Sequence, residues 1–197
     1  MHMPAQRTDT RRWTEEEFYA ARDAAPPGER WELVDGELLV TPSPHWTHQN
    51  VVGRLFVLLD AYVRAHSLGM VFCAPLDVRL RSGLVTQPDL LVVPAGLLGT
   101  YEDTVNQLLL AVETISPGSA RFDRVVKRPR YQRERVPEYW IIDQRSETIE
   151  RWRPDDERPE ILADRLIWHP EGAVEPLDVD VVRFFADLAL PREEGSG

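Results

Sequence analysis

Two acidic residues and the only lysine of the chain follow one another in an order that could form a charged site. Asp89 opens the apolar run 90–93, and Glu113 lies near the end of the apolar run 108–114. An acidic side chain on a buried strand is costly unless it is paired, protonated or bound to a cation. If the two strands are neighbours, their carboxylates repel each other unless a divalent cation lies between them. The alternative is that each acid ends its strand paired with an arginine.

Lys127 is the single lysine among 23 basic residues, and all the others are arginine. Arginine serves well for surface charge and bidentate contacts, but it does not replace a compact ammonium that reaches one oxygen as a point charge. The lysine therefore indicates a position where arginine is unsuitable, unless Lys127 is an ordinary solvated helix residue. Mg²⁺ prefers hard oxygen ligands from one or two carboxylates, and a nearby ammonium can stabilise charge that develops on a phosphate.

Length and charge limit the class of protein. The 197 residues suit one domain, and the formal net charge of −10 argues against a protein that coats nucleic acid by bulk electrostatics. Residues 121–135 are an exception, because they carry seven basic and two acidic residues. This segment is either a local phosphate-binding surface or a solvated helix face. With Cys73 as the only cysteine, an intrachain disulfide and a cysteine-based zinc site are excluded.

The chain contains no apolar run of the roughly 20 residues that a membrane span needs. Residues 1–12 also lack the apolar stretch of a signal peptide, so we expect a cytoplasmic protein. We expect flexible tails at 1–12 and 191–197 and a single domain at 13–190.

The elements that must position the charged residues follow from the turn and capping signals. Thr14, followed by three glutamates, predicts a capped N-terminal helix, and Asp35-Gly36 predicts a tight β-hairpin. A long helix is expected from Ser43 to about His66. Further strands are expected at 71–74, 76–80, 88–93, 108–114, 138–143 and 148–152, with a turn at 81–83, and further helices at 121–134 and 180–188. Pro129 should kink or shorten the first of these helices. This order predicts one α/β domain with a mixed sheet.

Taken together, the motifs resemble the PD-(D/E)XK nuclease superfamily, and more closely its Uma-two branch of restriction-endonuclease-like proteins. The resemblance covers about residues 13–190. It rests on these segments: 32–37, His48, 87–93, 112–117, 123–127 with Tyr131, and 136–143. It implies a restriction-endonuclease-like fold, in which helices flank a mixed β-sheet core that is preceded by an N-terminal helix and a β-hairpin.

The resemblance also implies a magnesium-dependent phosphodiesterase site in which Mn²⁺ can substitute. Asp89 and Glu113 would be metal ligands, and the carbonyl of Thr114 would be a backbone ligand. The superfamily usually places its lysine two residues after the second acid, where this chain has Ile115. The resemblance therefore implies that Lys127, from the following helix, supplies the third catalytic side chain.

A second group of residues is less strongly marked. Glu32 would reach the metal or its waters from the hairpin, or else it is a strand charge paired with an arginine. His48 would contact a phosphate or a metal-bound water, or else it is an ordinary surface or core histidine. Tyr131 lies four residues after Lys127 and shares its helix face, so it would position the lysine or a substrate phosphate. Asp123, four residues before Lys127, would be its ion-pair partner.

The first functional prediction is a metal-dependent endonuclease that hydrolyses DNA phosphodiester bonds. Arg124, Arg128 and Arg130 would contact flanking phosphates, and a homodimer would supply two sites for two strands. One alternative is a non-catalytic nucleic-acid- or protein-binding module on a nuclease-like fold, because fold does not dictate function. Another is a metal-dependent hydrolase that acts on a smaller phosphate ester.

Overall fold

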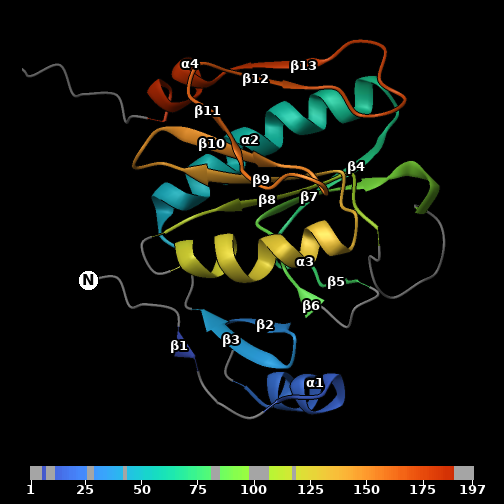
Figure 1. Ribbon diagram of the computed structural model, residues 1–197, viewed down its shortest axis with the longest axis vertical. Coiled ribbons are helices and arrows are strands. Elements are labelled where there is room, and N and C mark those ends of the chain that lie inside the picture. The colour runs from blue at the N-terminus through green and yellow to red at the C-terminus, as the bar shows by residue number, and fades with distance from the viewer. Residues whose placement is uncertain are drawn as a thin grey trace, which may run out of the picture.

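A six-stranded mixed sheet forms the centre of the computed structural model, which describes residues 6–7, 12–25, 29–41, 44–80, 85–97, 107–116 and 119–188 (Figure 1). The strand order is β11-β10-β9-β8-β7-β4. Its strands are β4 (Gly69–Cys73), β7 (Leu90–Pro94), β8 (Leu110–Thr114), β9 (Glu138–Asp143), β10 (Thr148–Trp152) and β11 (Glu160–Leu162). β8 and β9 run parallel and the other neighbours run antiparallel, so the expected mixed sheet is confirmed.

A smaller sheet holds the N-terminal hairpin, in the order β1-β3-β2-β6-β5. Its strands are β1 (Gln6–Arg7), β2 (Arg30–Val34), β3 (Glu37–Thr41), β5 (Val78–Arg79) and β6 (Val85–Thr86). Asp35 and Gly36 have φ angles of 51° and 77°, which confirms the tight hairpin turn. The helix α1 (Glu15–Asp23) packs on this sheet and begins with the predicted capping box of Thr14 and Glu17. A third, two-stranded sheet joins β12 (Arg165–Trp168) and β13 (Leu177–Asp180).

The strand expected at 76–80 has a different partner from the one predicted. We expected the strand at 76–80 to turn back through 81–83 into the strand at 88–93. That pairing is wrong, because β5 pairs with β6 in the smaller sheet, whereas β7 lies between β4 and β8. The cause is Val85, which is buried against Leu33 and Phe18 of the hairpin and α1. Residues 81–83 lie outside the described residues, as do 191–197 and most of 1–12. Within that first segment, Gln6 and Arg7 pair with β3 as β1.

Helices cover both faces of the large sheet (Figure 1). One face carries α2 (Trp46–Ala65), α4 (Val181–Ala186) and the β12–β13 pair. The other carries α3 (Arg128–Arg133) together with the preceding π-helical segment η2 (Phe122–Lys127), and the smaller sheet lies beyond them. A short 3-10 turn, η1 (Ala95–Leu97), follows β7. The N-cap of α2 is His45 and its first helical residue is Trp46, so the long helix begins three residues later than expected from Ser43.

Alternation along β7 and β8 decides which face receives the acidic side chains. Four residues pack with α2 in one core: Leu90, Val92, Leu110 and Val112. Three residues between them pack in a second core, with Tyr131 of α3 and Val34 of the hairpin: Leu91, Val93 and Ala111. Because successive strand side chains point to opposite faces, Asp89 and Glu113 belong to the second set. Both carboxylates therefore point into the layer between the large sheet and the smaller one.

Candidate active site

Asp89 and Glu113 lie opposite each other where β7 begins and β8 ends. The antiparallel register pairs Leu90 with Val112, so one further step brings Asp89 opposite Glu113. Both residues are buried, with exposed fractions of 4% and 2%. The backbone N–H of Thr114 donates to Oδ2 of Asp89 at 2.7 Å, so the carboxylate continues the hydrogen bonding of the sheet beyond the last backbone pair. The predicted closeness of the two acids is confirmed.

The ammonium of Lys127 is buried among three carboxylates. Its Nζ lies 2.7 Å from Oε1 of Glu113, 2.8 Å from Oε1 of Glu32 and 3.6 Å from Oδ1 of Asp123. Lys127 is 2% exposed, which rules out a solvated helix residue. Asp123 is the ion-pair partner that its spacing predicted. A compact ammonium fits this enclosed place, whereas the larger planar guanidinium of arginine needs more room.

The helix that carries Lys127 is irregular at this point. η2 is π-helical, and the N–H of Arg128 donates to the carbonyl of Asp123, five residues back. Pro129 has no N–H to donate and stands in the first turn of α3, where proline is tolerated. Arginine side chains bind two nearby carbonyls: Arg128 Nε donates to Arg124 at 3.0 Å, and Arg130 Nη1 donates to Val126 at 2.9 Å. Pro129 therefore lies in the first turn of α3, and Lys127, which precedes that helix, still reaches the carboxylates.

Glu32 reaches the same cluster from β2. Its Oε1 accepts from the hydroxyl of Thr86 at 2.7 Å and from the backbone N–H of Gln87 at 2.8 Å, in addition to its contact with Lys127. The hydroxyl of Tyr131 lies 3.3 Å from that of Thr86. Glu32 is therefore a buried member of the site, and Tyr131 is linked to it through Thr86.

His48 and Arg30 complete the surroundings of Asp89. His48 Nε2, in the first turn of α2, lies 2.9 Å from Asp89 Oδ2. Arg30 Nη1 lies 2.5 Å from Asp89 Oδ1, while its Nη2 lies 3.3 Å from Glu113 Oε2 and also donates to the carbonyl of Gln87. Sequence reasoning missed Arg30. A signal was present, because Arg30 and Glu32 are two residues apart on one strand and so share a face.

Carboxylates outnumber cations in this site. We call six residues the acidic cluster: Arg30, Glu32, Asp89, Glu113, Asp123 and Lys127. Four carboxylates and two permanent cations give these six residues a formal charge of −2. An excess of buried negative charge is stabilised by a proton or by a further cation.

The pKa shifts follow from this imbalance. Burial raises the pKa of Glu113 well above its ordinary value, and Asp89 and Asp123 add to the effect, although Lys127 and Arg30 oppose it. Burial acts on Asp89 in the same direction, but Arg30 and the hydrogen bond from His48 outweigh it and lower the pKa of Asp89. Asp89 is therefore the ionised member of the opposed pair, and Glu113 is the member that most readily holds a proton.

The opposed pair already binds one cation, the guanidinium of Arg30. Within the described ranges, no group of three or more His, Cys, Asp or Glu side chains is arranged to hold a metal ion. Instead, Arg30 bridges Asp89 and Glu113 and takes up oxygens of both. Hard carboxylate oxygens that face a shared cation are the donors that a divalent ion such as Mg²⁺ requires. The donor set thus fits such an ion in its chemistry.

The three arginines expected to bind phosphate are engaged within the protein. Arg124 Nε lies 2.7 Å from Glu150 Oε1, and its Nη2 lies 3.2 Å from Asp143 Oδ2. The guanidinium of Arg128 lies 4.5 Å from the ring centroid of Trp152. Arg130 forms an ion pair with Asp35 of the hairpin turn. Binding of phosphate by these side chains therefore competes with internal partners.

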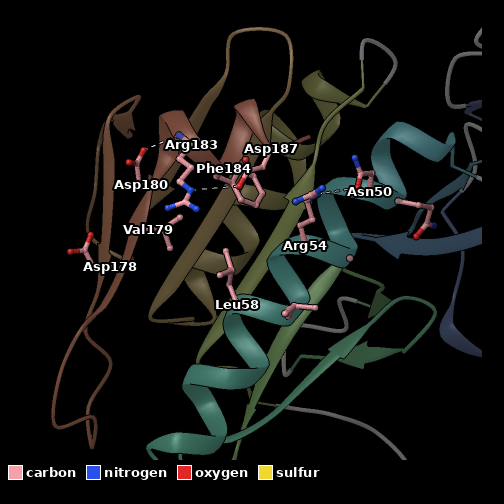
Figure 2. Close-up of a pocket in the computed structure, with 12 residues that line it drawn as sticks. Asn50, Arg54, Leu58, Asp178, Val179, Asp180, Arg183, Phe184 and Asp187 are labelled. Atoms are coloured by element: carbon pink, nitrogen blue, oxygen red, sulfur yellow. Dashed lines mark hydrogen bonds and ion pairs between the residues drawn. The ribbon is translucent and has the colours of Figure 1, made fainter. Parts of the chain in front are cut away.

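A hollow of about 870 Å³ lies beside α2, and Figure 2 shows the side chains around it. It is formed by α2 together with β13 and α4, and its lining includes Arg54, Leu58, Asp180, Arg183 and Phe184. No member of the acidic cluster lines it. The hollow and the buried cluster are therefore separate sites.

Comparison with known proteins decides the family. The family model Uma2, described as "Putative restriction endonuclease", matches residues 15–180. The chain belongs to the Uma2 family. Among solved structures, it is similar to one described as a "putative nuclease belonging to DUF820" from Anabaena variabilis, with a TM-score of 0.74 and 19% identity. The match covers 89% of this chain and 99% of the other, and it confirms the nuclease-like fold.

A search among curated proteins gave no match. In the part of this Uma2 chain that the structure describes, no helix is both long and apolar enough to cross a membrane.

Proposed function

We propose that this Uma2 protein is a magnesium-dependent endonuclease that hydrolyses the phosphodiester bonds of DNA. The observation that carries the proposal is the arrangement of two buried carboxylates, opposed in strand register, with the only lysine of the chain bound to one of them. The family description and the nuclease-like fold support the same reaction class.

Asp89 and Glu113 would hold the metal ion, with the carbonyl of Thr114 as a backbone ligand, and Mn²⁺ would substitute for Mg²⁺. The formal charge of −2 on the acidic cluster suits one divalent cation. When bound, the ion supplies Lewis-acid stabilisation of the charge that develops on the phosphate.

Lys127 would stabilise negative charge on the phosphate during hydrolysis. Burial disfavours its ammonium form, but Glu113 and Glu32 raise the pKa of Lys127 above its ordinary value. The side chain therefore stays protonated and acts as a fixed positive charge rather than as a base. Glu32 holds the ammonium in place, and Glu32 accepts from the hydroxyl of Thr86, which in turn lies 3.3 Å from that of Tyr131. His48 orients the carboxylate of Asp89.

DNA is the proposed partner, and a homodimer would bring two sites to the two strands. Arg124, Arg128 and Arg130 lie on the same helical segment as Lys127 and would contact flanking phosphates after leaving their internal partners. The bridge from Arg30 to both acids favours one competing function. In a non-catalytic nucleic-acid- or protein-binding module, this guanidinium would be the permanent counter-ion of the pair.

Cleavage of supercoiled plasmid tests the proposal. The purified protein is incubated with Mg²⁺, Mn²⁺ or EDTA, alongside Asp89→Asn and the matched control Asp178→Asn, which alters a strand aspartate paired with Arg165 outside the cluster. We expect metal-dependent nicking that Asp89→Asn abolishes and Asp178→Asn retains. Absence of nicking with either metal, or nicking that survives Asp89→Asn, would overturn the proposed nuclease site.

A further inference from the structure

Arg30 occupies the part of the acidic cluster that lies nearest to solvent. Its side chain is 22% exposed and that of His48 is 17% exposed, whereas Asp89, Glu113 and Lys127 are exposed by 4% or less. An ion that enters the cluster from water therefore meets Arg30 and His48 before it meets the opposed acids.

The contacts of Arg30 are those of a cation that fills a shared carboxylate site. One terminal nitrogen lies 2.5 Å from Asp89 Oδ1, and the other lies 3.3 Å from Glu113 Oε2 and donates to the carbonyl of Gln87. The guanidinium is thus bound to one oxygen from each acid. A divalent ion bound by the same acids would take up the same oxygens, and the two positive charges would repel each other at close range.

This position also leaves one donor of Arg30 unused. Its Nε is buried and, among the described residues, has no hydrogen-bond partner. A buried donor without a partner is unfavourable, so the carboxylates hold the guanidinium here against that cost. A phosphate group, by contrast, can accept from Nε and a terminal nitrogen together in the bidentate geometry that arginine favours.

We propose that Arg30 is a displaceable counter-ion: it neutralises Asp89 and Glu113 in the metal-free protein, leaves when a divalent metal binds, and then contacts the phosphate of the substrate. This inference rests on the proposed function, because it needs the metal site. Arg30 would thus have two roles. It neutralises the two carboxylates in the metal-free protein, and it contacts the substrate only after the metal has bound.

Metal affinity is the first readout, and it requires no catalysis. Mn²⁺ is titrated calorimetrically into the wild type, Arg30→Met and the matched control Arg151→Met, without DNA. Arg151 is also a buried arginine bound to a carboxylate, that of Glu160, but outside the cluster. Because the metal no longer has to displace a bound cation, we expect Arg30→Met to bind Mn²⁺ about tenfold more tightly than the wild type, and Arg151→Met to bind like the wild type.

The outcomes separate the two proposals. If the wild type binds Mn²⁺ but Arg30→Met binds it equally or more weakly, the displacement is wrong and the metal site stands. If neither the wild type nor any variant binds Mn²⁺, the proposed metal site and the displacement of Arg30 are both wrong.

A measurement on the wild-type protein tests the displacement without depending on whether Arg30→Met folds. The Nε–H signal of Arg30 is followed by NMR during addition of Mg²⁺, and it is assigned by its loss in Arg30→Lys. We expect this signal to shift as the metal binds, while the Nε–H signal of Arg151, assigned in the same way, does not move. An Arg30 signal that does not move at saturating Mg²⁺ would contradict the displacement.

The contact with substrate is tested by binding of a short fluorescent DNA duplex in Ca²⁺ and in EDTA, with a gel to verify that the DNA stays intact. Arg30→Met should weaken binding in Ca²⁺ and leave it unchanged in EDTA. If Arg30→Met weakened DNA binding equally in Ca²⁺ and in EDTA, the proposal that the metal releases Arg30 to contact the substrate would be wrong.

Discussion

Lys127 Nζ lies 2.7 Å from Oε1 of Glu113, although Lys127 comes fourteen positions later in the chain. The position two residues after Glu113, where the resembled superfamily usually has its lysine, is filled by Ile115. Ile115 is 8% exposed and packs in the core with Tyr131. The π-helical segment η2 thus brings an ammonium to the place that the strand itself does not supply.

The buried ammonium predicts that Lys127→Arg is not a conservative change. A guanidinium is larger than the enclosed space among three carboxylates, and overpacking a core costs about 1–3 kcal/mol. We expect plasmid nicking to fall by about 100-fold or more and urea unfolding to show a destabilisation of that size. Lys127→Met, which leaves the carboxylates without their cation, should lose about 3–5 kcal/mol. A wild-type nicking rate in Lys127→Arg would contradict the requirement for lysine.

Glu32→Gln is predicted to destabilise the protein even though the two side chains have nearly the same shape. Oε1 of Glu32 accepts from Lys127, Thr86 and the N–H of Gln87, and the change removes the charge from these hydrogen bonds. We expect a loss of about 1.5–3 kcal/mol in urea unfolding. The exposed control Glu157→Gln should stay within about 0.5 kcal/mol of wild type. Equal stability of the two variants would mean that Glu32 does not anchor the lysine.

The raised pKa of Glu113 predicts a pH dependence of stability in the metal-free protein. A carboxyl group with a higher pKa in the folded state binds more protons there than in the unfolded chain. Its contribution is complete below the ordinary pKa of 4.5 and is lost as the pH rises through the raised value. In EDTA, the free energy of unfolding should therefore decline from about pH 4.5 upward, and Glu113→Gln should remove this part of the decline. If the free energy of unfolding of the wild type and of Glu113→Gln depended on pH in the same way, the raised pKa of Glu113 would be contradicted.

Salt dependence of DNA binding tests the three arginines near Lys127. A side chain that neutralises one phosphate of duplex DNA contributes about 0.9 to the slope of log affinity against log salt concentration. Because an internal partner competes with the phosphate for each side chain, we expect each alanine variant of Arg124, Arg128 and Arg130 to reduce this slope by part of that amount. The slope is measured by fluorescence anisotropy in EDTA. A slope that stays unchanged would contradict the proposed phosphate contact of that arginine.

Local signals explain what could be predicted from the sequence. Asp35-Gly36 and Thr14 have strong turn and capping preferences, and the long apolar runs mark the central strands, so these elements were predicted close to their observed positions. Asp89, Glu113 and Lys127 could be selected because acids at the ends of buried strands and a single lysine are unusual. The distances between them are then set by the register of β7 and β8 and by the π-helical segment η2, which carries Lys127.

The missed features depend on contacts between distant segments. Arg30 is one of 22 arginines, and only the folded arrangement brings the start of β2 to the start of β7, where Arg30 reaches Asp89. β6 has two residues, too few for a periodic pattern, and is held by the burial of Val85 against the hairpin. The burial of the site residues, their ion pairs and the internal partners of Arg124 could not be predicted either, because they depend on the folded arrangement.

The most direct test of the central claim is a crystal structure of the protein grown with Mn²⁺, examined by anomalous diffraction. The claim is that Asp89 and Glu113 form a divalent cation site beside Lys127. We predict an anomalous peak between the two carboxylates that is absent from crystals of Asp89→Asn. A saturating Mn²⁺ concentration that leaves this place without a peak, with Arg30 still bridging the two acids, would contradict it.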